Sequence, residues 1–222
     1  MYTADCMVIS EIFYSVQGEG PYMGTPSIFV RTGMCNLSCG WCDTKYTWHP
    51  EFADYSELAS KKVVHEIGEL AKAKGCRHLI ITGGEPMLQQ NAIAEIRENF
   101  SDFFIEVETN GTIPLSIPVD VINHFNISPK LSNSGNRPYD VRLRVDNAIY
   151  KFVVDKPEDI AEIANYIEKN KLPRDRVWLM PQGQTKAELL KRNEWVEKSA
   201  AENGWKYTPR LHVMMWNGER GR

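Results

Sequence analysis

Residues 35–44 read CNLSCGWCDT and place three cysteines within eight positions. Thiolates are soft ligands that favour zinc or an iron–sulfur cluster over calcium or magnesium. The number three is informative, because four cysteines would close a cubane cluster or a structural zinc site. Cys35, Cys39 and Cys42 fit three irons of a [4Fe–4S] cluster and would leave the fourth iron open to an outside ligand.

Two other interpretations of the same cysteines remain open at this point. The three thiols could bind zinc, with His49 as a fourth ligand, although zinc loops usually come as two spaced pairs. They could also be redox-active or unliganded thiols. Cys6 and Cys76 stand alone in the sequence and provide no second pair.

Length and composition set limits on the class of protein. The chain has 222 residues, of which 42% are hydrophobic and 25% charged, as in an ordinary globular protein. We expect one domain over residues 1–222. The net charge of −3 gives no basic field for nucleic acid, and no run approaches the roughly 20 apolar residues of a membrane helix. Five cysteines cannot all pair, so reduced thiols in a cytoplasmic protein fit best.

Apolar runs alternate with helical patterns along the chain, which predicts an α/β protein with a parallel sheet. Strands are expected at 27–32, 78–82, 103–107, 121–127, 148–154 and 176–180, and helices at 56–74, 87–99, from Pro157 onward and at 185–203. About six strands fit an open partial (β/α) barrel better than a closed eightfold one, which typically needs ~250 residues. Residues 131–147 are expected to form a loop insertion, and the tail at 210–220 a final strand.

Polar clusters follow several of these strands. They occupy 35–44, 82–86, 108–111, 128–130 and 181–184. The carboxyl ends of parallel strands meet at one edge of a sheet, where α/β folds place their sites. These distant segments are therefore expected to build one pocket.

The CxxxCxxC loop, followed by TGGEP at 82–86, resembles the radical S-adenosylmethionine (radical SAM) enzymes. That resemblance implies a radical SAM-type barrel. It also implies that the open iron chelates the amino and carboxylate groups of S-adenosylmethionine.

A narrower resemblance is to the 7-carboxy-7-deazaguanine synthases, a family of carbon–nitrogen lyases. The combination of Gln-Gly-Glu-Gly with Trp-Cys-Asp-Thr is more specific than the cysteine spacing alone. The matching segments are SVQGEG at 15–20, PSIFVR at 26–31, WCDT at 41–44, ETNG at 108–111, ISPK at 127–130, and Leu211-His212 with Trp216.

The resemblance implies a reaction. A flavodoxin-type reductant gives one electron to the cluster, and S-adenosylmethionine is cleaved to methionine and a 5′-deoxyadenosyl radical. This radical, rather than a catalytic side chain, takes hydrogen from C6 of 6-carboxy-5,6,7,8-tetrahydropterin. The ring contracts, ammonia is lost, and 7-carboxy-7-deazaguanine forms on the route to queuosine and related 7-deazapurines. S-adenosylmethionine is regenerated in this reaction. The resemblance also implies a homodimer.

The same resemblance assigns site residues. Gln17 offers a donor and an acceptor to a pterin edge, and Arg31 a fork for the substrate carboxylate. Thr44 matches a magnesium contact, for which a hydroxyl is a suitable hard ligand. Expected substrate contacts are Val16, Gln17, Gly18, Arg31 and Thr82. Expected cofactor contacts are Trp41, Cys42, Asp43, Gly84, Ser128, Pro129, Lys130, Met180, Pro181, Gln182 and Gly183.

Each assignment has a simpler alternative. Trp41 could merely pack, Arg31 could form a surface salt bridge, Thr44 could cap a loop, and Gly84 could serve a plain turn. Residues 180–183 depart from the Gln-Pro form of some family members. Glu108 could face the site or not. Arg220–Arg222 receive no role. At the level of the whole protein, a glycyl-radical-activating enzyme and a zinc-binding interaction module are the competing functions.

Overall fold

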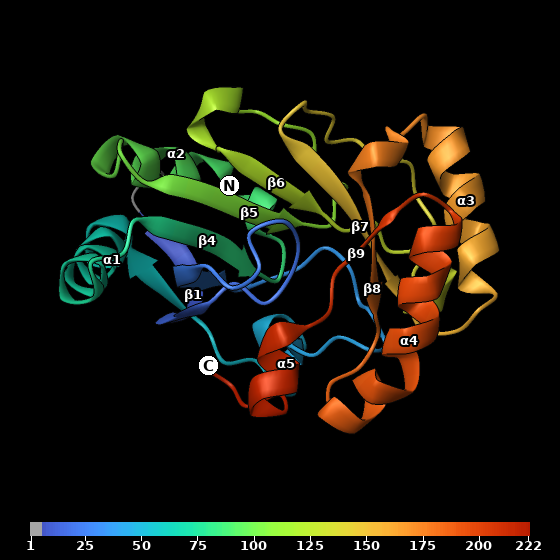
Figure 1. Ribbon diagram of the computed structural model, residues 1–222. Helices are drawn as coiled ribbons and strands as arrows, with labels where there is room; N and C mark the ends of the chain where they lie inside the picture. The colour runs from blue at the N-terminus through green and yellow to red at the C-terminus, as the bar shows by residue number, and fades with distance from the viewer. Residues whose placement is uncertain (1–5) are drawn as a thin grey trace.

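The computed structural model describes residues 6–222, so the first five residues of the expected domain lie outside the description. Across this range, nine strands form one sheet in the order β3-β1-β2-β4-β5-β6-β7-β8-β9 (Figure 1). The strands are β1 (Cys6–Val16), β2 (Pro26–Thr32), β3 (Ser56–Ala59), β4 (His78–Gly83), β5 (Phe104–Thr109), β6 (His124–Ile127), β7 (Ala148–Val154), β8 (Val177–Pro181) and β9 (Lys206–Tyr207).

The expected parallel partial barrel is confirmed. From β2 to β9 every neighbouring pair is parallel. The six predicted strands are β2 and β4–β8, and all seven residues of β7 are buried, as expected of a strand covered on both faces. Three further strands were not predicted: β1 and β3 extend one edge in antiparallel fashion, and β9 has only two residues.

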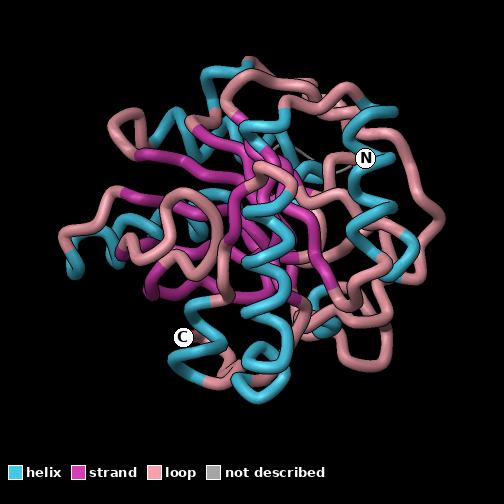
Figure 2. Tube along the Cα trace, turned by 45° about the vertical axis from the view of Figure 1, so that its right-hand side comes forward, coloured by secondary structure: helices cyan, strands magenta, loops and turns pink. Residues whose placement is uncertain are grey.

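Four helices of ten or more residues flank the sheet, and a fifth, shorter one follows β9. They are α1 (Ser60–Lys74), α2 (Gln90–Asn99), α3 (Asp159–Asn170), α4 (Lys186–Glu202) and α5 (Leu211–Trp216). In Figure 1, α1 and α2 lie on one side of the fan of strands and α3 and α4 on the other. Figure 2 shows the strands gathered in the middle with helices around them.

Local signals explain where two helices begin and end. α1 ends at Gly75, whose φ of 62° is left-handed and suits glycine at a helix end, as the sequence predicted. α4 begins with a capping box, in which Thr185 accepts from the Glu188 N–H and Glu188 accepts from the Thr185 N–H. The start predicted for the first helix was four residues early, because residues 56–59 pair with β1 as β3.

The tail was predicted wrongly. Residues 210–220 do not form a strand; Leu211–Trp216 form α5, which ends at Asn217 with a φ of 53°. The largely apolar run LHVMMW suits either structure over six residues. The following Asn217-Gly218 pair is a helix-stop signal that would have favoured the helix.

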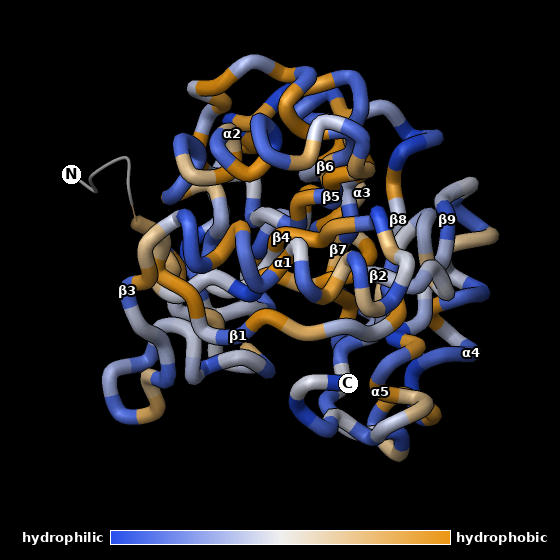
Figure 3. Tube along the Cα trace, turned by 90° about the vertical axis from the view of Figure 1, so that its left-hand side faces the viewer, coloured by the Kyte–Doolittle hydropathy of each residue, from blue (hydrophilic) through white to orange (hydrophobic). Residues whose placement is uncertain are grey.

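Buried apolar side chains from both halves of the sheet form one core. Phe125 and Phe152 are its largest fully buried members. Figure 3 shows hydrophobic colour concentrated along the central strands and hydrophilic colour on α4 and the outer loops. Residues 131–147 contain only the short 3-10 helix η4 (Ser132–Ser134) as regular structure, yet Val141 and Leu143 pack into the core. Among residues 6–222, none of the helices has the length and apolar character needed to cross a membrane.

Candidate active site

One cavity collects the polar segments that follow the parallel strands. It is lined from the ends of β4, β5, β6 and β8, by the cysteine loop (residues 35–44), and by the glycine-rich loop (residues 17–20). Every site residue predicted from the sequence lines it except Pro129, which is buried outside the lining. The expectation that these distant segments share one pocket is therefore confirmed.

Two glycines hold the cysteine loop close to the end of β4. A Cβ on Gly84 would lie 1.8 Å from the Met34 carbonyl oxygen, and one on Gly83, with φ of +128°, would lie 2.2 Å from the Thr32 oxygen. Without side chains, the backbones approach closely enough for Gly84 N to donate to Thr32 O at 3.0 Å and Glu85 N to Met34 O at 2.8 Å. Gly84 is thus required by packing, whatever contact it makes with a cofactor.

Glu85 is the side chain that joins this turn to the next strand. It is fully buried and accepts hydrogen bonds from the Met87 N–H, the Thr109 hydroxyl and the Asn110 N–H. Burial raises its pKa, although these three donors oppose the shift. The carboxyl group therefore links the ends of β4 and β5 through hydrogen bonds.

The three cysteine sulfurs each accept a hydrogen bond. Leu37 N donates to Cys35 Sγ at 3.5 Å, Asn136 Nδ2 to Cys39 Sγ at 3.2 Å, and Trp48 Nε1 to Cys42 Sγ at 3.3 Å. Such donors stabilise negative charge on sulfur and tune iron–sulfur clusters. Trp48 and Asn136 were not predicted, since nothing in the sequence links Asn136 to a cysteine 97 positions away.

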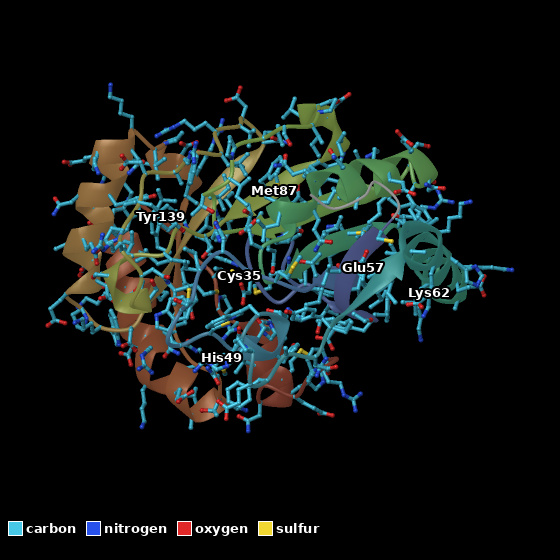
Figure 4. The ribbon with its side chains drawn as sticks, turned by 180° about the vertical axis from the view of Figure 1, so that it is seen from behind. Cys35, His49, Glu57, Lys62, Met87 and Tyr139 are labelled. Carbon is cyan, nitrogen blue, oxygen red and sulfur yellow. The ribbon has the colours of Figure 1, made fainter. Side chains whose placement is uncertain are left out.

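The donor set fits a cluster better than the two alternatives. Burial raises the pKa of Cys35 to about 12 and also raises that of Cys39, so the free thiols are poor nucleophiles. His49 packs against Trp48 and Phe52, and Figure 4 shows it apart from Cys35. His49 therefore does not join the three cysteines as the fourth zinc ligand of that alternative.

Trp41 and Lys130 form one wall beside the cysteines. The Trp41 indole N–H donates to the Asn133 carbonyl at 2.8 Å, and the Lys130 ammonium lies 5.7 Å from the centre of the indole ring. Lys130 Nζ also donates to the Ser128 hydroxyl and carbonyl at 2.7 and 3.0 Å. Burial lowers the pKa of Lys130, although the nearby cysteines oppose this.

Gln17 has most of its hydrogen-bonding capacity engaged within the protein. Its Nε2 donates to Glu106 at 2.7 Å and to Glu108 at 3.3 Å, while its Oε1 accepts from the Glu19 N–H. Thr82 donates to the other oxygen of Glu108 at 2.7 Å. Glu108 therefore faces the cavity and orients two residues expected to contact the substrate.

Arg31 and Thr44 both reach the cavity. The Arg31 Nε donates to Glu11 at 2.7 Å in a pair whose side chains are each less than a fifth exposed, so it is not a surface salt bridge. The Thr44 side chain makes no capping hydrogen bond to the following 3-10 helix, η1 (Lys45–Thr47), and its Oγ1 lies 3.6 Å from Cys42 Sγ. The loop-cap alternative for Thr44 is thus not what the geometry shows.

The sequence reasoning missed a buried charge cluster that completes the cavity. Glu19 pairs with Lys151, and with Arg210 Nε at 3.0 Å; Arg210 also pairs with Asp43. Burial raises the pKa of Glu19, but the cations Lys151 and Arg210 outweigh it and hold the pKa well below the usual range. Arg210 and His212 belong to the closing segment (residues 208–222), which packs on the glycine-rich loop: a Cβ on Gly18 would lie 2.0 Å from His212 Nδ1.

Comparison with known proteins gives consistent results. The model of the Radical SAM superfamily matches residues 29–191. The 7-carboxy-7-deazaguanine synthase of Halobacterium salinarum is 38% identical over 94% of this chain and 90% of its own length, and that of Pyrobaculum aerophilum is 34% identical over 96% of both.

Among solved structures, the crystal structure of QueE from Escherichia coli aligns with a TM-score of 0.72 over 93% of this chain and 95% of its own. At 24% identity, this match speaks for the fold.

Proposed function

Because the chain belongs to the radical SAM superfamily and, within it, to the 7-carboxy-7-deazaguanine synthase family, we propose that it converts 6-carboxy-5,6,7,8-tetrahydropterin to 7-carboxy-7-deazaguanine with loss of ammonia. One observation carries the proposal. The hydrogen-bonded cysteine sulfurs and the glycine-rich loop line the same cavity. A cofactor and a small substrate bound there would be neighbours.

Membership in this superfamily implies a [4Fe–4S] cluster and S-adenosylmethionine, which together supply the radical chemistry on the substrate when bound. Cys35, Cys39 and Cys42 would hold the cluster. Gly84, with Trp41, Asp43 and the turns at 128–130 and 180–183, would line the S-adenosylmethionine site. The protein's own residues would bind and orient the cofactor and the substrate and exclude water from them.

The substrate would lie against the glycine-rich loop. The cavity lining carries five cationic side chains, Arg31, Lys130, Lys151, Arg210 and Arg222, against three carboxylates, Glu19, Asp43 and Glu108. This local excess of positive charge, on a chain whose net charge is −3, suits a carboxylated pterin. Gln17 and Glu108 present fixed polar groups, because each is already held by hydrogen bonds. Preorganised groups of this kind lose little entropy when a ligand binds.

Thr44 is proposed as a magnesium contact. Its hydroxyl lines the cavity without a capping role, and magnesium usually keeps several waters while using few protein groups. A flavodoxin-type reductant, a homodimeric assembly and a single domain that includes residues 131–147 also belong to this proposal.

The match to 7-carboxy-7-deazaguanine synthases over nearly the whole chain favours a small substrate over a protein substrate. The closing segment packs over the glycine-rich loop through Leu211 N, which donates to Gly18 O at 2.9 Å. Conversion of the carboxytetrahydropterin is therefore preferred over activation of a partner protein.

The direct test uses anaerobically reconstituted protein with S-adenosylmethionine, magnesium, a reductant and the carboxytetrahydropterin. We expect 7-carboxy-7-deazaguanine by mass spectrometry and none when S-adenosylmethionine is omitted. Iron and sulfide are measured on the same sample. A fully loaded protein that makes no product would contradict the proposal.

A further inference from the structure

Arg210 joins three segments that are far apart in the sequence. Its Nε donates to Glu19 Oε1 at 3.0 Å, its Nη1 to the Gly183 carbonyl at 2.6 Å, and its Nη2 to Asp43 Oδ2. The side chain is only about 10% exposed and lines the cavity. Its pKa is raised, because Asp43 and Glu19 outweigh the opposing effect of burial, so it stays charged.

The shape of the guanidinium group matters here as much as its charge. Three of its nitrogens point to three acceptors in one planar fork, which an ammonium group on a flexible stem cannot reproduce. Two of these acceptors are carboxylates, and a buried carboxylate left without its partner is costly. The arrangement therefore fixes the three segments at defined distances from one another.

The segments that Arg210 joins belong to different parts of the site. Glu19 lies in the glycine-rich loop, two residues from Gln17, and is also paired with Lys151. Asp43 directly follows the ligand Cys42 and precedes Thr44. Gly183 follows β8 in the turn expected to contact S-adenosylmethionine. A shift of the guanidinium would change the spacing between the pterin loop and the cysteine loop.

We propose that Arg210 is a positioning residue that holds the glycine-rich loop and the cysteine loop in register, so that the substrate lies at reacting distance from the cofactor. This inference rests on the proposed function. Misplacement of reacting groups by about 1 Å can cost ~10²-fold in rate even when binding persists. Loss of the fork should therefore separate cofactor cleavage from product formation.

The experiment compares wild type with Arg210→Lys and Arg210→Ala. Arg192→Lys is the matched control. Arg192 also donates through three nitrogens, to Asp155 Oδ1 at 2.6 Å and to the Asp155 and Glu188 carbonyls, but it is half-buried on α4 and does not line the cavity. Four quantities are measured: iron and sulfide content, the change in the electron paramagnetic resonance spectrum on adding S-adenosylmethionine, the rate of product formation, and 5′-deoxyadenosine released per product.

For Arg210→Lys we expect unchanged iron content and an unchanged spectral response, a fall of ~10²-fold in product formation, and a clear rise in 5′-deoxyadenosine per product. Arg210→Ala should show the same pattern more strongly, and Arg192→Lys should behave as wild type. A merely structural role would lower iron content and both activities in proportion and would overturn the proposal, as would Arg210→Lys with a wild-type ratio.

Wild type assayed in parallel keeps the two proposals apart. If wild type makes no product, the proposed function fails and the inference falls with it. If wild type turns over and Arg210→Lys matches it, only the positioning role is contradicted.

Discussion

The cysteine loop and the closing segment reach the same cavity, but they are held there by different kinds of interaction. The cysteine loop, with Met34 just before it, is held mainly by uncharged groups: Glu85 N donates to Met34 O, Gly40 N to Ser134 O, and Trp41 Nε1 to Asn133 O. The closing segment is fixed largely through charged side chains, with Arg210 on Glu19 and Asp43, and Arg220 on Glu11 and Asp54.

This difference predicts different sensitivities. The backbone contacts that lead into the cysteine loop, at Thr32 and Met34, depend on the absence of side chains at Gly83 and Gly84, so steric changes should disturb them. The charged contacts of the closing segment should respond to pH, to salt and to the loss of a single charge. The following predictions test that distinction, from the largest expected effect to the smallest.

Removing one thiol should abolish function without unfolding the loop. In Cys39→Ser we expect loss of the brown chromophore and of all product formation, because a cluster held by two cysteines is not retained. The backbone contacts of the loop should persist, so the thermal midpoint measured without cluster should match that of apo wild type. Cys6→Ser, at the start of β1, is the control and should keep its iron. Full iron content in Cys39→Ser would contradict the cluster assignment.

Breaking the buried ion pair behind the closing segment should cost the most stability. Lys151→Met leaves buried Glu19 with fewer cationic partners, and breaking a buried pair costs about 3–5 kcal/mol. Lys169→Met is a matched control, since Lys169 pairs with Asp140 at 2.8 Å with both side chains more than half exposed; its loss should cost less than about 1 kcal/mol. Urea denaturation measures both, and equal losses would refute the distinction.

The same pair gives a pH dependence with a defined sign. The pKa of Glu19 is held below 4.5, its value in the unfolded chain, so its contribution to stability is complete above 4.5 and is lost as pH falls below that value. In Lys151→Met the pKa of Glu19 should be less depressed. The stability difference between wild type and variant should therefore shrink as pH falls from 6 toward 3 in denaturation curves.

A methyl group at Gly84 should disturb the cysteine loop by crowding. Its Cβ would lie 1.8 Å from the Met34 oxygen, and overpacking typically costs about 1–3 kcal/mol. Gly40→Ala is the control within the same loop, because a Cβ there would be 3.9 Å from its nearest neighbour, the Ser134 oxygen. We expect Gly84→Ala to lower cluster content after reconstitution and Gly40→Ala to preserve it. Equal cluster content would argue against backbone fixation.

The strands that could be predicted from the sequence differ from those that could not in how regular their apolar pattern is. The six central strands were predicted because apolar residues recur through each of them between turn signals, almost without interruption in β4 and β7. β1 was missed because its burial does not alternate: Met7–Ile9 are all buried and the next five residues are all half-buried, on either side of a bulge between Ile9 and Glu11. The two-residue β9 is too short to leave a pattern.

In the site, too, residues that lie close together in the sequence could be predicted, and residues that meet only in the fold could not. The cysteine loop could be recognised because its ligands lie within eight residues. Lys151 and Arg210 could not, because each pairs with Glu19 across 132 and 191 positions, and in the sequence they are ordinary lone charges. The one usable clue was composition: on a chain of net charge −3, an anionic substrate requires a few local cations.

Arg220 tests the exposed end of the closing segment. Its Nε donates to Glu11 at 3.1 Å, its Nη1 to Asp54 at 2.7 Å, and its guanidinium lies 4.0 Å from the centre of the Tyr46 ring. The side chain is 41% exposed, so the pairs are screened and the ring contact adds little. We expect Arg220→Ala to cost less than about 1 kcal/mol of unfolding free energy at low salt, and less still at 1 M salt.

Arg77→Ala is the control, since Arg77 has an exposed pair with Asp102 at 2.9 Å but belongs to neither region. Arg77→Ala should cost no more than Arg220→Ala. A loss from Arg220→Ala as large as that from Lys151→Met would mean that the exposed end fixes the segment as firmly as the buried charges do. A salt-independent loss would point to packing on Tyr46 instead. We expect Lys151→Met to cost more unfolding free energy than Arg220→Ala because the Lys151–Glu19 pair is buried, whereas the Arg220 pairs are partly surrounded by water.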